Sequence, residues 1–515
     1  MVELRKAILA SLTILCSLLV PFTLLVPFIM ECKVSVKAST TTWTVDDDGP
    51  ADFHTIQEAI NSASSGDRIF VRAGIYHEHV AVDKSLTLVG ENRDSTIIDG
   101  NGTGSVISIK ADSVCIESFT VNKSGTSASE YDSGIFVERS SGNNISHNTI
   151  TNNYYGISLY SSIGNTVSDN TISNNYDGIR LYSSSIGNTV SDNTISNNEY
   201  GISLYSSIGN TVSDNTISNN DYGIILFDSS NNLVFHNNFI NNTQQQAYSY
   251  NSVNLWDNGV EGNYWSNYTG VDLNNDGIGD TPHVIDTRNQ DKNPLKGMYS
   301  DFIITSEGEN YCVLIICNST ISGFRFETGL ETGNKIIRFN ATGKDDTVGF
   351  CRVGIPIELM NYPYILLIDA EEIAPTLLDI SNETYSYLYF TYVHTTYTIS
   401  IISSKTLYLY YELIDKYTKL KDDLYNLNET YHDLLNNYSI LLDDYGQLQE
   451  NYSELNNTYN DHLADYSKNV NNIRNLMYIF AASTAIFIIT TIYLSKYAHT
   501  NKNKVFGDAQ KKRTL

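Results

Sequence analysis

The fold is decided by Ile163-Gly-Asn-Thr-Val-Ser-Asp-Asn-Thr-Ile-Ser-Asn-Asn-Tyr-Asp-Gly-Ile-Arg-Leu-Tyr-Ser-Ser184, a stretch that the chain repeats. It returns almost unchanged from Ile186 and again from Ile208, and looser copies flank it from Ser141 and Asn231. Equivalent asparagines are evenly spaced to within one residue, at Asn148, Asn170, Asn193, Asn215 and Asn237. A fixed period of about twenty residues indicates a solenoid.

Each copy reads as a set of short strands. Apolar residues come in short alternating runs at Val167, Ile172 and then Ile179 and Leu181, with Gly and Asn-Ser clusters between them. This is strand and turn punctuation without a helical period. A copy has room for about three strands of ordinary length. Because one coil cannot bury its own inner face, the coils must stack. The sequence therefore predicts a parallel β-helix.

Stacking also predicts an internal ladder of amides. Coils would lie about 4.8 Å apart, so equivalent side chains would be neighbours. Asn170, Asn193 and Asn215 would then bond one to the next, as polar ladders do in other stacked β structures.

The repeat carries a family resemblance. Its pattern, Asn-x-Ile-x-x-Asn-x-x-Gly-Ile-x-Leu, resembles the NosD-type repeat of the carbohydrate-binding and sugar-hydrolysis (CASH) group, found on archaeal surface proteins among others. The resemblance covers roughly residues 43–295 and implies a right-handed parallel β-helix. Because β-helices host many activities, it says little about function.

Composition restricts the class of partner. The 515 residues include 32 Lys and Arg against 58 Asp and Glu, a net charge of −26. Such a surface argues against nucleic acid as a partner. With so long a chain, several domains are expected.

The chain begins with an export-like segment and a capped entrance. Residues 1–38 read as a signal peptide, with an uncleaved membrane anchor as the alternative. The β-helix is expected over 43–298. A short amphipathic helix at 51–63 would place Ile56, Ala59, Ile60 and Ala63 over the first coil, where it would block an open sheet edge.

Aromatic residues and an Asp-rich loop follow the array. Trp256 and the segment Gly262-Asn-Tyr-Trp265 are predicted to plug its end. The next segment, Asp272-Leu-Asn-Asn-Asp-Gly-Ile-Gly-Asp280, spaces hard oxygen donors as the first part of an EF-hand loop does. We expect it to bind structural Ca²⁺ through Asp272, Asn274, Asp276, the carbonyl of Ile278 and Asp280. It departs from the EF-hand at His283, where a bidentate Glu would stand, and an Asx-rich turn without metal is the alternative.

Residues 299–405 lose the period and show strand-like runs, which predicts a small β-sandwich. It is similar to the immunoglobulin-like modules of archaeal surface proteins. A disulfide is expected between Cys351 and either Cys312 or Cys317, and the sequence leaves the choice open.

Residues 406–474 follow a heptad pattern. Tyrosine dominates the a positions from Tyr410 and leucine the d positions from Leu413, and no proline interrupts. The pattern predicts a coiled-coil stalk and a homo-oligomer, with a single solvated helix as the alternative.

Residues 476–494 are apolar and long enough to span a bilayer. The tail at 495–515 is basic, which predicts that it is cytoplasmic and that the rest of the mature chain is extracellular. Asn-x-Ser/Thr sequons from Asn101 to Asn456 agree with that side.

A catalytic site is hard to assemble from the repeats. Asp169, Asp192 and Asp214 precede ladder asparagines and would stack into a carboxylate row, with His147 and His236 at its ends. The row could hold a cation-assisted saccharide site, or it could consist of duplicated turn residues. Arg180 is the one basic residue within the repeats, so an acid–base pair is not evident.

Two functions therefore compete. The first is a non-catalytic surface protein whose β-helix binds glycan or cell-envelope material. The second is a membrane-tethered polysaccharide lyase or glycoside hydrolase with a carboxylate and Ca²⁺-dependent site. The interchangeable coils and the lack of a basic partner favour the first function.

Overall fold

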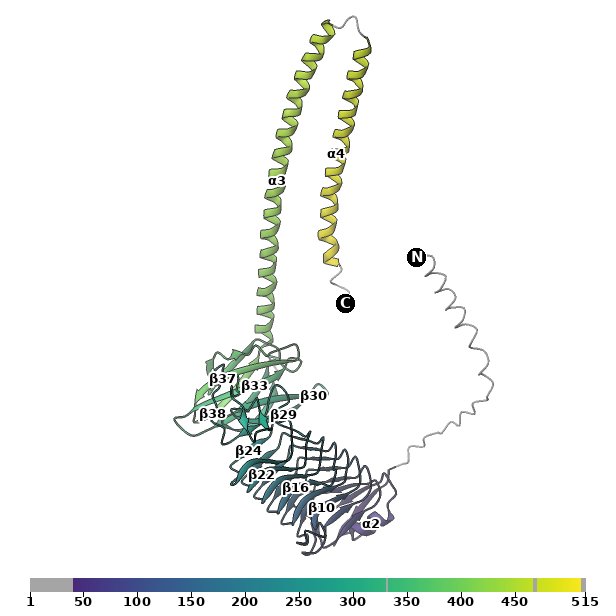
Figure 1. Cartoon of the computed structure of the whole chain (residues 1–515), viewed down its shortest axis with the longest axis vertical. Helices are drawn as coiled ribbons and strands as arrows, with labels where there is room; N and C mark the ends of the chain where they lie inside the picture. The colour runs from purple at the N-terminus through teal and green to yellow at the C-terminus, as the bar shows by residue number, and fades with distance from the viewer. Residues whose placement is uncertain (1–39, 330–331, 466–469, 511–515) are drawn as a thin grey trace, which may run out of the picture. The chain divides into compact units, whose positions relative to one another are not determined.

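The computed structural model describes residues 40–329, 332–465 and 470–510. The signal segment at 1–38 and the last five residues of the basic tail lie outside them. Residues 42–265 form a parallel β-helix of three sheets, whose coils stack one after another (Figure 1). This confirms the predicted solenoid and its three strands per repeat.

The three sheets each take one strand from successive coils. The first has nine strands, β1 (Thr42–Val45), β2 (Arg68–Val71), β5 (Thr87–Gly90), β8 (Cys115–Glu117), β11 (Asn144–Ser146), β14 (Thr166–Ser168), β17 (Thr189–Ser191), β20 (Thr211–Ser213) and β23 (Leu233–Phe235). The second has eight, β4 (Val80–Val82), β7 (Ile107–Ile109), β10 (Ser133–Glu138), β13 (Tyr155–Tyr160), β16 (Asp177–Tyr182), β19 (Tyr200–Tyr205), β22 (Tyr222–Phe227) and β25 (Gln245–Tyr250). The third has nine, β3 (Gly74–Tyr76), β6 (Thr96–Asp99), β9 (Thr120–Asn122), β12 (Thr149–Thr151), β15 (Thr171–Ser173), β18 (Thr194–Ser196), β21 (Thr216–Ser218), β24 (Asn238–Ile240) and β26 (Tyr264–Trp265).

The apolar residues of the repeat fill the interior. Val167, Ile172, Ile179 and Leu181 have no exposed surface, and their counterparts in the next coils stack directly on them. Alternation along each short strand turns the flanking Thr and Ser outward. Gly178 brings two coils close, because a Cβ there would lie 2.6 Å from the carbonyl oxygen of Gly201.

The predicted asparagine ladder is present. The Nδ2 of Asn148 donates to the Oδ1 of Asn170 at 3.1 Å, and the chain of bonds continues through Asn193, Asn215 and Asn237 to Asn263. The structure adds ladders that the sequence analysis missed. Two more consist of asparagines, and one consists of serines running from Ser140 to Ser252.

Both ends of the solenoid are closed as expected, but the first helix begins at Ile56 and not at Ala51, since Phe53 forms a parallel bridge with Val45. Helix α2 (Ile56–Ser62) buries Ile56, Ala59 and Ile60, and the hydroxyl of Thr55 caps it by accepting from the backbone of Glu58 at 3.3 Å. At the other end, Trp256 and Trp265 are fully buried, with Trp265 stacked on Phe239 at 4.4 Å between ring centroids. A two-stranded hairpin of β27 (His283–Val284) and β28 (Gln290–Asp291) follows the plug.

Residues 298–403 form two antiparallel sheets of five strands each around one core, which confirms the predicted sandwich-like region. One sheet contains β29 (Met298–Ser306), β30 (Glu309–Cys317), β33 (Val348–Pro356), β37 (Tyr385–Val393) and β36 (Thr376–Leu377). The other contains β31 (Thr320–Thr328), β32 (Lys335–Thr342), β38 (Thr396–Ser403), β34 (Tyr364–Ile368) and β35 (Glu371–Ile373).

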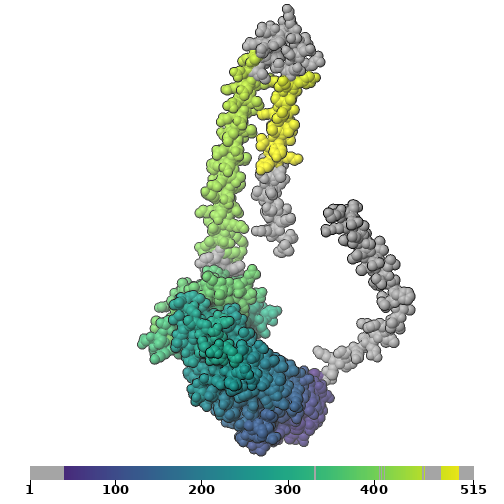
Figure 2. All heavy atoms as spheres, viewed as in Figure 1, coloured from purple at the N-terminus to yellow at the C-terminus, as the bar shows by residue number. Residues whose placement is uncertain are grey.

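The sandwich packs on the plugged end of the solenoid, and the two belong to one compact unit (Figure 2). The Asn238 side chain pairs with the backbone of Tyr299 through two hydrogen bonds of 2.8 Å. Buried Arg352 forms an ion pair with buried Glu261, which comes from the solenoid.

A separate unit begins at Leu409. Helix α3 (Lys405–Asp465) is unbroken over 61 residues, about 90 Å, which confirms a helix where the stalk was expected. Helix α4 (Val470–Gln510) contains Met477–Tyr497, a segment long and apolar enough to cross a membrane. Within this unit α3 contacts α4: the ring centroids of Tyr445 and Phe487 are 6.2 Å apart, and those of Tyr452 and Phe480 are 4.9 Å apart. Whether α3 pairs with the same helix of a second copy stays a prediction.

The strand register decides between the two disulfides left open by the sequence. Cys317 on β30 lies directly opposite Cys351 on β33, both are buried, and their Sγ atoms are 2.7 Å apart. Cys312 instead lies opposite Ile303, with its Sγ 3.8 Å from the Oδ2 of Asp301.

We therefore expect oxidised protein to contain a Cys317–Cys351 disulfide. Non-reducing peptide mapping should find this pair linked, with Cys312 free to be alkylated. Replacing Cys317 by Ser should lower the free energy of unfolding by about 2–4 kcal/mol, whereas Cys312→Ser should leave the link intact. A peptide joining Cys312 to Cys351 would contradict this assignment.

Candidate functional site

The outer face of the eight-stranded sheet carries two columns of aromatic side chains. Strands β10, β16 and β22 mark this sheet in Figure 1. The first tyrosine column consists of residues in register on successive strands, Tyr160, Tyr182, Tyr205, Phe227 and Tyr250. The second tyrosine column lies where the same strands begin, at Tyr154, Tyr176, Tyr200 and Tyr222.

Neighbouring rings touch throughout the second column. In the first column they touch from Tyr160 to Tyr182 and from Tyr205 to Tyr250, and the guanidinium of Arg180 lies over both Tyr182 and Tyr205. Centroids are 4.8 Å apart between Tyr160 and Tyr182 and 5.5 Å apart between Tyr205 and Phe227. In the second column the spacings are 5.0, 5.5 and 5.4 Å. Aromatic pairs at these distances stabilise one another, and most of these rings stay half-exposed. The result is a ribbed apolar surface along the solenoid.

One acidic residue, Asp177, stands between the columns. Its side chain is 3% exposed, and its Oδ2 accepts a 2.7 Å hydrogen bond from Ser203. Burial raises the pKa of this carboxyl to about 6, against the opposing effects of Ser203 and Arg180. The other oxygen, Oδ1, is buried without a hydrogen-bond partner.

Arg180 lies beside this carboxyl. Its Nε is 3.8 Å from the Oδ2 of Asp177, and its guanidinium carbon lies 4.3, 4.7 and 5.2 Å from the ring centroids of Tyr155, Tyr182 and Tyr205. Such contacts are attractive between a cation and an aromatic face. The Nε of Arg180 and the hydroxyl of Tyr182 also have no hydrogen-bond partner although they are buried.

This pair was missed in the sequence. From the sequence, Arg180 was the one basic residue within the repeats and no acid–base pair was evident, whereas the structure places Asp177 next to it. Residues three apart face opposite sides of a regular strand, so alternation hides the contact. The available signal was that both residues depart from the repeat in the same coil: their register partners one coil on are Tyr200 and Ser203.

The aspartate row is present at a corner of the solenoid. Asp169, Asp192 and Asp214 have φ values of 57°, 59° and 61°, the left-handed conformation that Asp and Asn tolerate better than most residues. This geometry fits duplicated turn residues. Burial, with Asp214, Asp301 and Asp169 nearby, still raises the pKa of Asp192 to about 6. Asp301 is contributed by the sandwich.

The row ends in a buried charge chain at the joint with the sandwich. His236 lies 3.4 Å from Asp214 through Nδ1 and 2.8 Å from Glu261 through Nε2, and its ring stacks on Tyr299 at 3.9 Å. Burial would lower the pKa of His236, but hydrogen bonds to both carboxylates raise it. Glu261 in turn pairs with Arg352. These basic groups are thus engaged in holding the joint.

In the Asp272–Asp280 loop, the carboxylate oxygens that could bind a cation accept hydrogen bonds from the loop's own backbone. Asp272 accepts from the N–H groups of Asp276 and Gly277 at 3.1 and 2.9 Å, and Asp280 accepts from Leu273 at 2.6 Å. Asn274 donates its side-chain N–H to Asp276 at 2.9 Å. The loop has the compact turn that a cation site needs, and these same bonds also fit an Asx-rich turn.

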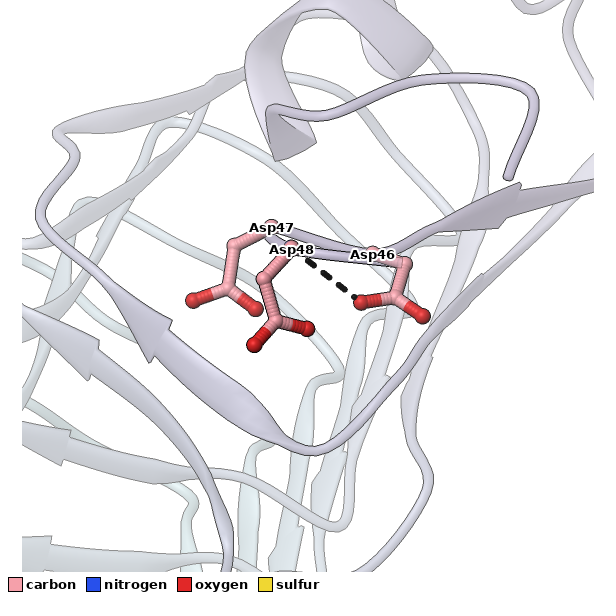
Figure 3. A group of neighbouring side chains, drawn as sticks. All are labelled: Asp46, Asp47 and Asp48. Atoms are coloured by element: carbon pink, nitrogen blue, oxygen red, sulfur yellow. Dashed lines mark hydrogen bonds between the residues drawn. The ribbon is translucent and has the colours of Figure 1, made fainter. Parts of the chain in front are cut away.

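Another acidic group lies at the entrance of the solenoid. The carboxylates of Asp46, Asp47 and Asp48 lie within 4.8 Å of one another (Figure 3). The carboxylate of Asp46 accepts from the backbone of Asp48 and Gly49 at 3.3 and 3.0 Å, and Asp47 accepts from Ile75 at 3.3 Å. These backbone hydrogen bonds fit a solvated turn.

Comparison with known proteins agrees with this geometry. Residues 60–270 match the family model described as periplasmic copper-binding protein (NosD). The solenoid is a NosD-type β-helix.

Relatives share parts of this NosD-type β-helix. A cell surface glycoprotein of Methanothermus fervidus is 38% identical over 113 residues, which are 20% of this chain and 18% of the relative. A probable pectinesterase/pectinesterase inhibitor of Arabidopsis thaliana is 41% identical over 75 residues, 13% of this chain and 12% of the relative. The matches thus span less than a fifth of either relative.

Among solved structures, the catalytic domain of a GH87 alpha-1,3-glucanase in complex with tetrasaccharides is similar. It is 16% identical with a TM-score of 0.33, over 41% of this chain and 39% of the other.

Proposed function

We propose that this is a membrane-anchored extracellular surface protein whose NosD-type β-helix binds glycan or cell-envelope material. The observation that carries the proposal is the pair of tyrosine columns with Asp177 and Arg180 between them. Aromatic faces provide broad apolar contact, and a few buried polar groups provide orientation, which is the usual composition of a small-molecule or sugar site. The similarity to a cell surface glycoprotein supports the location.

The anchor in this proposal is α4. Its segment Met477–Tyr497 has 21 residues with a mean hydropathy of 1.9. Basic residues follow it at Lys502, Lys504 and in Lys511-Lys-Arg513. Positive charge on the cytoplasmic side would leave the solenoid and sandwich outside.

A second function, a membrane-tethered polysaccharide lyase or glycoside hydrolase, is favoured by one observation. The pKa of Asp192 is raised to about 6, so its carboxyl can exchange a proton near neutral pH, as a general acid or base must. Its neighbours Asp169 and Asp214 would complete the catalytic row.

The two functions are separated by incubating full-length protein in detergent with a polysaccharide panel and Ca²⁺. We expect retention of a glycan without release of shorter products, because the coils of the row are nearly interchangeable. Asp192→Ala should not change that retention. Product release that Asp192→Ala abolishes would establish the lyase or hydrolase instead.

We further propose that the Asp272–Asp280 loop binds structural Ca²⁺. Asp272, Asn274, Asp276, the carbonyl of Ile278 and Asp280 supply the hard oxygens, and the loop packs between solenoid and sandwich at Gly277 and Phe350. Ca²⁺ should therefore raise the thermal unfolding midpoint of this unit.

Calorimetric titration measures this site directly. We expect saturable binding that Asp276→Asn weakens by about tenfold or more, because one charged ligand is lost. Asp228→Asn, an exposed substitution elsewhere on the solenoid, is the matched control. Absence of binding at millimolar calcium would refute the site.

The last part of the proposal is a homo-oligomer formed through α3. Its d-position leucines are largely exposed on the single helix, with Leu420, Leu427 and Leu434 at 67%, 66% and 63%. A stripe of this kind is stabilised when it packs against equivalent helices.

Sedimentation of the full chain in detergent tests the stalk. Wild-type protein should sediment as a discrete oligomer, and Leu427→Lys with Leu434→Lys should shift it to monomer by placing charges in the seam. Tyr425→Lys, at an exposed b position, should leave the oligomer intact. A monomeric wild-type protein would rule out the coiled coil.

A further inference from the structure

The centre of the two tyrosine columns contains three buried polar atoms without hydrogen-bond partners. They are the Oδ1 of Asp177, the Nε of Arg180 and the hydroxyl of Tyr182. Asp177 is 2% exposed and Tyr182 6%. An unsatisfied buried polar group costs roughly 1–3 kcal/mol, so three at neighbouring side chains indicate a place built to meet another molecule.

The unpaired atoms offer both kinds of hydrogen bond. Asp177 presents an acceptor, Arg180 a donor and Tyr182 a hydroxyl that can act as either. A sugar hydroxyl also donates and accepts, so one ring could satisfy all three groups. The apolar C–H faces of a pyranose suit the half-buried rings of Tyr200 and Tyr205 nearby.

Charge selects the class of sugar. Arg180 is the positive group at this centre, and Asp177 and Glu199 are both negative and close enough to interact. In register with Arg180 stand Ser158, Ser203 and Ile225, which add no charge. A uronate would therefore meet net negative potential here, on a chain whose total charge is −26.

The charged residues near Tyr160, at one end of the first tyrosine column, do not make this face attractive to a polyanion. Arg139 lies 5.2 Å from the ring centroid of Tyr160, but Glu138 pairs with it at 3.2 Å and with Lys110 at 3.3 Å. A polyanionic chain would thus find no continuous row of cations along the described face.

The repeated rings of the first tyrosine column indicate that the ligand is a polymer. The first tyrosine column presents one ring per coil over five consecutive coils, from Tyr160 to Tyr250. Equal spacing of like rings suits a polymer of like units better than a single sugar.

We infer that this face binds an uncharged polysaccharide along the solenoid, with Asp177 and Arg180 as its polar anchor and the tyrosine columns as its platform. The inference rests on the proposed glycan-binding function and specifies its site and its ligand class.

The test compares neutral and acidic polysaccharides as probes for full-length protein in detergent. Affinity electrophoresis would use soluble glucans and mannan against polygalacturonate and alginate. We expect neutral polymers to retain the protein and polyuronates not to. Arg180→Gln and Asp177→Asn should each weaken retention about tenfold or more, as loss of a charged hydrogen bond implies.

The controls separate binding from folding. Arg325→Gln, in an exposed ion pair of the sandwich, should leave retention unchanged. Arg180→Lys keeps the charge but not the planar donor set, so it should restore stability more than binding. Thermal unfolding of each variant verifies the fold.

A pH series gives a readout that a purely structural role would not produce. The groups facing Asp177 are Arg180, Glu199 and the hydroxyls of Tyr155, Tyr176, Tyr200 and Tyr205. Because the carboxylate is the better acceptor, affinity should rise between about pH 5 and 7, and this rise should vanish in Asp177→Asn.

Three outcomes would overturn the inference, and they differ in what they leave standing. Polyuronate binding that depends on Arg180 would keep the glycan-binding function and refute the neutral ligand. Neutral binding that both variants retain would refute the site. Retention by no polysaccharide would refute the proposed function together with this inference.

Discussion

The structure depends on hydrogen bonds that satisfy the backbone where each coil turns a corner. Asn170 illustrates the arrangement: its backbone N–H and its side-chain N–H both donate to the Oδ1 of Asn193, at 3.0 Å each. The same side chain donates to the carbonyls of Ser168 and Ile145 at 2.9 and 2.8 Å. A buried peptide group without a partner would cost about 1–3 kcal/mol, and the ladder prevents that loss at every coil.

The ladders also determine where the solenoid can vary. The one extra residue in the repeats falls among Ser183, Ser184 and Ser185. Ser183 and Ser184 both take left-handed φ values, 59° and 70°, so the insertion projects outward. Ser185 stays buried and accepts from the backbone of Ser162 at 3.3 Å, which keeps the serine ladder in step. Variation is thus accommodated outside the corners while the buried ladder residue keeps its place.

The sequence predicts well what repeats or is local, and less well what depends on distant contacts. Stacked coils, the Asn170 ladder, the α2 cap and the Trp256 and Trp265 plug follow from periodicity and short apolar patterns. The joint of Glu261 with Arg352 joins residues far apart in the chain, so no local pattern indicates it. Asp177 and Arg180 were missed for a different reason, since strict strand alternation places them on opposite faces.

The residues that stand in neighbouring coils at the positions of Asp177 and Arg180 also indicate function. Ion pairs with little exposure stabilise a fold weakly, because desolvation offsets much of the attraction. Two coils beyond Arg180, the equivalent position holds Ile225, which is buried and packs without a charge. The positions in register with Asp177 hold Tyr155 and Tyr200, which extend the aromatic surface. The solenoid therefore folds at these positions without any ion pair. An acid and a base that add little stability, stand together in one coil and leave buried polar atoms without hydrogen-bond partners are better explained by a ligand than by the fold.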